Sequence, residues 1–125
     1  LILGTWLAST IASWNPRVGE INDLLEADTQ LASYEYPFRV VTLENGVARL
    51  SSPRSFEVPV IRFLGVLYPD LQGKPQDDPA VMAAQDELVG YQKHAAALVQ
   101  AQPDVTSVRW VLDRDWYLKR GILLD

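Results

Sequence analysis

The stretch Phe38-Arg39-Val40-Val41-Thr42-Leu43-Glu44-Asn45-Gly46-Val47-Ala48-Arg49-Leu50-Ser51-Ser52 decides the fold of this chain. Asn45 and Gly46 both tolerate the positive φ that a two-residue type I′ turn requires, and strand-forming residues flank them on both sides. The sequence therefore predicts a β-hairpin with strands at about Phe38–Leu43 and Val47–Ser52. Because apolar residues occur on both faces of these strands, we expect helices or a partner chain to cover both sides of the hairpin.

Helices are predicted on either side of the hairpin. Asn15-Pro16 offers a side-chain N-cap and a proline at the first helical position, and an amphipathic pattern continues to about Ala27. Asp78-Pro79 repeats this start, and apolar residues at helical spacing then predict one long helix that ends near Ala101. A further strand is predicted from Val105 to Leu112.

The segment Phe56–Tyr68 is rich in β-branched and aromatic residues, which favour a strand, although Pro59 cannot donate to a central ladder. We expect it to be extended. The predicted fold class is therefore α+β, with a short N-terminal helix, a β-hairpin and further strands that form a small sheet packed against one long helix. With 125 residues, 48% of them apolar, residues 1–125 are expected to form a single domain.

Composition excludes several classes of function. A formal net charge of -5 argues against a protein that binds duplex nucleic acid, because neutralising phosphates requires a basic surface. Without cysteine there is no disulfide, thiolate nucleophile or zinc-thiolate site. Residues 1–14 are uncharged and shorter than the roughly 20 residues of a membrane span. They are expected to pack in the core or to be the remnant of an anchor, in a chain trimmed from a longer protein.

The hairpin and the helix before it resemble the first half of a BON domain, a small α+β module found mostly in bacterial envelope and periplasmic proteins. The matching residues are Leu24, Leu25, Asp28, Leu31, Val40, Gly46, Val47, Leu50 and Ser51. The end of the long helix and the run Gln102-Pro103-Asp104-Val105-Thr106-Ser107-Val108 resemble the family's closing helix, Pro-Gly-Val junction and last strand. The chain differs in the residues from Pro53 to Asp78, which have no counterpart in the family, and in Asp104, where the family has glycine.

The resemblance implies a non-enzymatic binding module with no catalytic residues and no cofactor, located in the periplasm or cell envelope, with a cytoplasmic location as the alternative. Its partner is expected to be a protein or an envelope component, bound through the sheet edge or the C-terminal tail, and membrane association is compatible with the family. The tail alternates aromatic rings with cations, a composition common in binding surfaces, so it supplies the predicted partner-binding residues Arg114, Trp116, Tyr117, Lys119 and Arg120.

Two expectations for the aromatic residues follow from their positions. The tail around Trp116 either folds back as a further element or presents apolar surface to a partner, and the sequence leaves both open. Trp110, in contrast, alternates with Val108 and Leu112 on one face of a strand, so we expect it to pack in the core. The rings of Tyr34, Tyr36 and Phe38 are likewise expected in the core and at its rim.

His94 is the only histidine, and no metal site is predicted because structural zinc needs three or four ligands. The acidic residues near the start of the long helix lack the spacing of a calcium loop. The alternative to a binding module is a small-ligand-binding or hydrolytic domain with a site assembled around His94 from Tyr36, Asp70 and Asp113. A deep polar pocket at His94 with two convergent carboxylates would favour this alternative.

Overall fold

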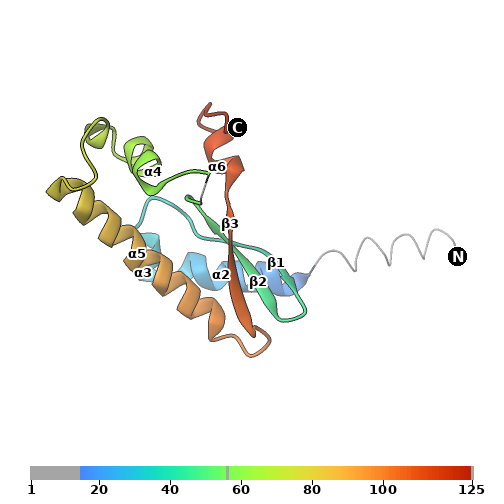
Figure 1. Ribbon diagram of the computed structural model, residues 1–125. Coiled ribbons are helices and arrows are strands. Elements are labelled where there is room, and N and C mark those ends of the chain that lie inside the picture. Colours follow the sequence, from blue (N-terminus) through green and yellow to red (C-terminus); the bar gives the residue numbers. More distant parts are fainter. Residues whose placement is uncertain (1–14, 56, 125) are drawn as a thin grey trace, which may run out of the picture.

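The computed structural model describes residues 15–55 and 57–124. Its elements, in chain order, are α2 Pro16–Ala27, α3 Thr29–Ala32, β1 Val40–Glu44, β2 Val47–Ser52, α4 Val60–Leu67, η1 Pro69–Leu71, α5 Pro79–Gln100, β3 Ser107–Leu112 and α6 Arg114–Leu118 (Figure 1). The sheet has the order β1-β2-β3, with β1 antiparallel and β3 parallel to β2. The α+β class is confirmed, and the long helix α5 packs against the sheet. Residues 1–14, expected in the core or as the remnant of an anchor, lie outside the described residues.

The turn of the hairpin also positions the third strand. Asn45 has φ of 51° and Gly46 has φ of 79°, the left-handed conformations that the Asn-Gly pair predicts. The carbonyl of Gly46 accepts hydrogen bonds from the backbone N–H of Thr106 (2.7 Å) and of Ser107 (3.2 Å), and from the Thr106 hydroxyl (3.0 Å). The hairpin is therefore confirmed, with β1 starting at Val40 rather than Phe38.

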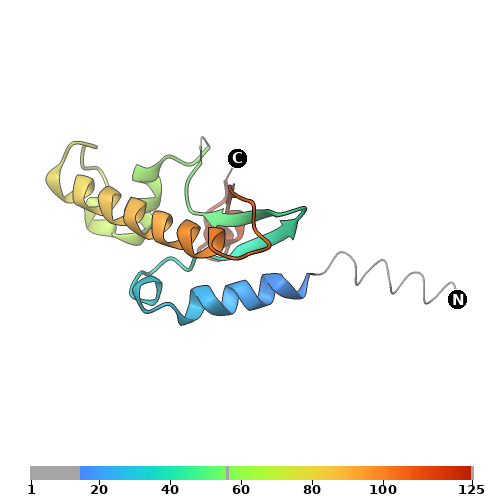
Figure 2. The ribbon, with the colours of Figure 1, turned by 90° about the horizontal axis from the view of Figure 1, so that it is seen from below.

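Helix α2 closes the β1 edge of the sheet with amide side chains. The Asn22 amide donates to the carbonyl of Val40 (3.0 Å) and accepts from its N–H (2.7 Å). The Asn15 side chain caps the helix through the N–H of Arg17 (2.9 Å) and also donates to the carbonyl of Leu43 (3.1 Å). Figure 2 shows α2 as a separate layer beside the sheet and α5. The edge strand β1 thus has outward-facing backbone groups that are satisfied within the chain.

The prediction of an extended segment at Phe56–Tyr68 is wrong for its second half, which forms α4. Pro59 immediately precedes the helix with φ of -65°, where its missing N–H costs nothing because the first turn of a helix has no acceptor for it. Phe63 and Leu64 are fully buried, so the apolar run serves one face of a helix and not a strand. Within the described residues, this segment adds no strand to the sheet.

One face of the sheet is covered, whereas the middle of the other is open. Ala48 and Leu50 are fully buried on the side of α5. On the opposite side Arg49 and Arg109 are exposed, and Val41 retains 54% of its surface. The expectation of cover on both sides of the hairpin is therefore wrong here, because within the described residues no helix lies over the middle of this face.

We expect Gly46→Ala to lower the free energy of unfolding by about 1–3 kcal/mol, because a side chain is strained at positive φ and its Cβ would lie 2.6 Å from the Thr106 hydroxyl oxygen. Urea denaturation measures the change. Gly73→Ala is the matched control, since Gly73 also has positive φ (81°) but a Cβ at this position would have no other atom within 4 Å. A Gly46 variant no less stable than the Gly73 variant would show that the Thr106 contact does not matter.

Candidate functional site

The β3 edge of the sheet is open, unlike the β1 edge. The N–H of Ser107 bonds to the Gly46 carbonyl (3.2 Å) and the N–H of Asp113 bonds to the Ser52 carbonyl (2.8 Å). Because backbone groups alternate along a strand, the odd-numbered residues of β3 face β2. The N–H and C=O groups that point away from β2 are those of Val108, Trp110 and Leu112. No hydrogen bond from elsewhere in residues 15–55 and 57–124 reaches them.

A groove of about 730 Å³ lies between β3 and α5. Val89 and Ala96 of α5 form one apolar wall, and Trp110 and Leu112 of β3 form the other. The groove is larger than the cleft of about 490 Å³ at α2 and α3, that of about 580 Å³ on the opposite face of the sheet, and that of about 440 Å³ beside α4. It therefore combines apolar walls with the unpaired backbone groups of a sheet edge.

Polar groups line the floor of the groove. Gln92 of α5 is buried, and its amide donates to the Ser52 hydroxyl (3.3 Å) and accepts from the Arg54 guanidinium (3.0 Å). The Ser52 hydroxyl in turn donates to the Arg54 carbonyl (3.0 Å). Arg54 and Lys93 bring two cations to the groove, and its lining contains no carboxylate. The site is therefore suited to an occupant that carries a negative charge.

Trp110 is half-exposed at this groove, which corrects the expectation that it packs in the core. Its indole retains 42% of its exposed surface, although one edge packs on Phe38 with ring centroids 6.2 Å apart. Strand alternation correctly places it on the same face as Val108 and Leu112. β3 is an edge strand, however, and α5 covers it only partly. A large ring held from one side and exposed on the other is typical of residues that anchor a partner.

The C-terminal tail folds back onto the protein, which is one of the two alternatives that the sequence leaves open. Trp116 is 6% exposed and Tyr117 is fully buried, and the Tyr117 hydroxyl donates to the carbonyl of Pro53. Asp113 caps α6 by accepting from the N–H of Trp116 (3.1 Å). Both rings are part of the core, so they cannot present the apolar surface that a partner would bind.

The three cations predicted in the tail are exposed and have neighbours of their own. Arg114 pairs with Glu57, and Lys119 pairs with Asp115 at 3.0 Å. The guanidinium of Arg120 lies 3.8 Å from the centre of the Trp116 ring. Surface pairs of this kind contribute little to stability, and the binding role of these three residues stays a prediction.

The residues of the alternative site form two separate pairs. The Nε2 atom of His94 lies 2.9 Å from a carboxylate oxygen of Asp28, and the hydroxyl of Tyr36 donates to Asp113 (2.8 Å). Asp70 is exposed on η1 and joins neither pair. His94 meets one carboxylate and lines none of the four clefts described above, so the pocket with two convergent carboxylates is not formed.

The titrating groups of these pairs have structural roles. The hydrogen bond from His94, together with the N–H groups of Leu31 and Gln30, holds the pKa of Asp28 below its usual value of 3.8. Asp28 is the N-cap of α3, at 3.0 Å from both N–H groups. Burial raises the pKa of Tyr36, which therefore stays protonated as a hydrogen-bond donor.

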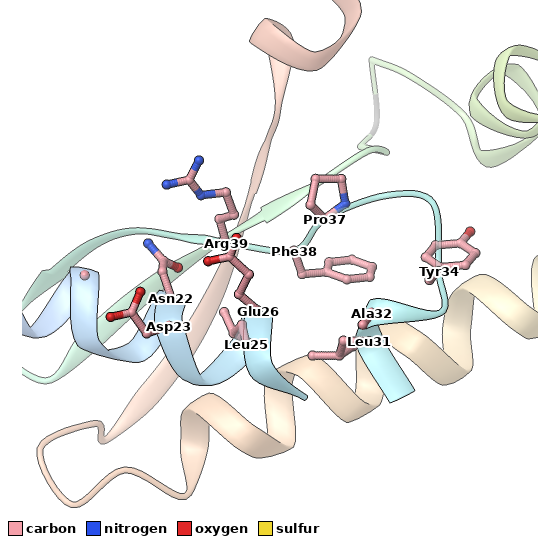
Figure 3. Close-up of a pocket in the computed structure, with 11 residues that line it drawn as sticks. Asn22, Asp23, Leu25, Glu26, Leu31, Ala32, Tyr34, Pro37, Phe38 and Arg39 are labelled. Carbon is pink, nitrogen blue, oxygen red and sulfur yellow. The ribbon is translucent and has the colours of Figure 1, made fainter. Parts of the chain in front are cut away.

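A second cleft lies between α2, α3 and the loop that enters β1 (Figure 3). Its amide group, from Asn22, is already bonded to Val40. The carboxylates of Asp23 and Glu26 are exposed, and Figure 3 shows Arg39 extending away from the ring of Phe38. The polar groups here either stabilise the fold or face solvent, so they do not converge on a ligand.

Two further findings concern the part of the chain that the structure describes. It contains no group of three or more His, Asp or Glu side chains placed to hold a metal ion. None of its helices has both the length and the apolar character that crossing a bilayer requires.

Comparison with known proteins gives no relative from which a function could be transferred. No family model matches the chain, and no curated protein or solved structure matches it either. The functional argument therefore depends on the geometry of the groove and of the β3 edge.

The open edge predicts an alternating pattern of hydrogen exchange in β3. We expect the amides of Arg109 and Val111, which face β2, to exchange at least about tenfold more slowly than those of Val108 and Trp110, which face away. Amide exchange followed by NMR tests this. Uniform protection along β3 would mean that another segment or a second copy of the chain already covers the edge.

The Asp28 pair predicts a specific dependence of stability on pH. Because the pKa of Asp28 is lowered in the folded state, its stabilising contribution is complete above about pH 5 and is lost as the pH falls through the folded-state pKa. Asp28→Asn, which can still cap α3, should lower the Tm at pH 7 and flatten its decline between about pH 5 and pH 3. Asp77→Asn, at an exposed position, is the control and should keep the wild-type slope.

Proposed function

We propose that this chain is a non-enzymatic interaction module that binds an extended segment of a partner protein as an additional strand along β3. The observation that carries the proposal is the outward-facing backbone of Val108, Trp110 and Leu112 next to an apolar groove. In strand addition, main-chain hydrogen bonds supply affinity, and side-chain pockets select every second residue of the incoming segment. A helix beside an open strand provides both.

The groove also indicates the chemistry of the partner segment. Trp110 and the aliphatic side chains of Val89 and Ala96 favour apolar residues at alternate positions. Lys93 is exposed on the α5 side of the groove, so a carboxylate reaching it gains a charge-assisted hydrogen bond. The expected partner segment is therefore extended, alternately apolar, and acidic at one or more positions that face the groove.

The resemblance to BON domains supports binding rather than catalysis. The order α2, β1, β2, α5 and β3 is the order of elements that the resemblance implies, with α4 and η1 between β2 and α5. That family is associated with bacterial envelope and periplasmic surfaces, so an envelope protein is the class of partner that we propose. The periplasm or the cell envelope is the corresponding location.

Selection from a phage-displayed library of random peptides against the immobilised chain tests the proposal. We expect enriched peptides to alternate apolar residues and to contain Asp or Glu, and to bind Trp110→Ala and Lys93→Glu at least about tenfold more weakly than wild type. Met82→Ala and Lys74→Glu are matched controls, because Met82 is 51% exposed and Lys74 is exposed, and both lie outside the groove.

The decisive measurement is amide exchange in the complex. Strand addition should protect the amides of Val108, Trp110 and Leu112 while those of the intervening residues, already bonded to β2, change little. Peptides that bind without protecting these alternate amides would rule out strand addition. Equal losses of affinity in the groove and control variants would show that the groove is not the binding site.

A further inference from the structure

The sheet face opposite α5 gathers arginines without counter-ions. Arg49 and Arg109 are direct neighbours in the parallel register of β2 and β3, so both side chains project from the same face. Arg39 lies on this face one row further, where its carbonyl bonds to Ser51. All three are exposed, and within residues 15–55 and 57–124 none of them forms an ion pair.

This arrangement does not serve stability. Like charges on neighbouring strands repel each other, and Arg49 bonds to the Thr42 hydroxyl (3.4 Å) of β1, on the side away from Arg109. The chain as a whole carries a net charge of -5 and has 16 acidic residues, yet no carboxylate neutralises these guanidinium groups in the described structure. A cationic face kept open on an acidic protein is complementary to a negatively charged partner.

The shape of this face favours a protein segment over a flat surface. A cleft of about 580 Å³ lies on it, with Val18 of α2 on one side and Lys119, just past α6, on the other. Val41 and Val111 add apolar surface to its floor, and Val41 is 54% exposed. Parallel strand pairs such as β2 and β3 are normally covered on both faces, most often by helices.

We propose that this trough, defined by Arg39, Val41, Arg49, Arg109 and Val111, is a docking site for an acidic amphipathic helix of a partner protein. The apolar side of that helix would contact Val41 and Val111, and its carboxylates would pair with the three arginines. The trough and the β3 groove lie on opposite faces of the sheet, so this docking does not depend on strand addition.

The probe is a synthetic helical peptide of about 18 residues with leucines along one side and glutamates flanking them, and the control peptide carries lysine in place of each glutamate. We expect the glutamate peptide to bind the full chain and the lysine peptide not to bind. Arg109→Glu should weaken binding at least about tenfold, whereas Arg62→Glu, at an exposed cation of α4, should change it less than about twofold. Fluorescence anisotropy at about 50 and 200 mM salt measures both effects, which should weaken with salt.

Thermal stability separates a binding role from a structural one. Arg109→Glu replaces a repulsion by an attraction with Arg49, so its Tm should rise by about 1–4 °C while binding is lost. A lowered Tm together with lost binding would overturn the assignment unless Arg39→Glu, with an unchanged Tm, also loses binding. Equal binding of the two peptides, or no effect of either arginine variant, would overturn it directly. Binding to phosphatidylglycerol vesicles that requires these arginines, without binding to the glutamate peptide, would assign the face to lipid and also overturn it.

Discussion

The carbonyl of Gly46 is the point on which the arrangement of the sheet depends. A type I′ turn needs two residues at positive φ, and Asn45-Gly46 supplies them. The same turn directs one carbonyl toward the start of β3, where Thr106 and Ser107 bond to it. This contact fixes the parallel register of β3 on β2, and α5, which leads into β3, must then cross the sheet on one face only. The open edge and the open face both follow from this placement.

The two edges of the sheet are treated differently. An uncovered strand edge invites pairing with other chains, and proteins normally block it with bulges, charges or covering segments. β1 has an irregular register near Val40 and is closed by the Asn22 amide. β3 pairs regularly with β2 over all six of its residues and leaves Trp110 half-exposed. A protein that blocks one edge so fully and leaves the other unblocked has an arrangement that favours an added strand on the unblocked side.

Local chemistry made much of this fold predictable. Asn15-Pro16, Asn45-Gly46 and Asp78-Pro79 each restrict a few dihedral angles regardless of what surrounds them, so the two main helices and the hairpin could be placed from the sequence. The segment at α4 could not, because Pro59 is compatible both with an edge strand and with the residue before a helix. Only the burial of Phe63 and Leu64 decides between them.

The candidate surfaces required information that no local pattern holds. Trp110 lies on the predicted face of its strand, but its exposure depends on β3 being an edge, which is a matter of strand order. The neighbouring positions of Arg49 and Arg109 depend on the register between strands 60 residues apart in the chain. The tail, whose composition indicated a binding surface, supplies Trp116 and Tyr117 to the core instead.

One strand serves both proposed surfaces because its side chains alternate. Trp110 and its even-numbered neighbours face the groove, whereas Arg109 and Val111 face the trough. An added strand would use the backbone of the even-numbered residues and leave the arginine side chains free, so the two partners do not compete for the same atoms. Any energetic coupling between them must then pass through the rigidity of β3 itself, since an edge strand that gains a second ladder loses freedom on both faces at once. Because such coupling is reciprocal, a helix in the trough would favour the incoming strand by the same factor as the strand favours the helix.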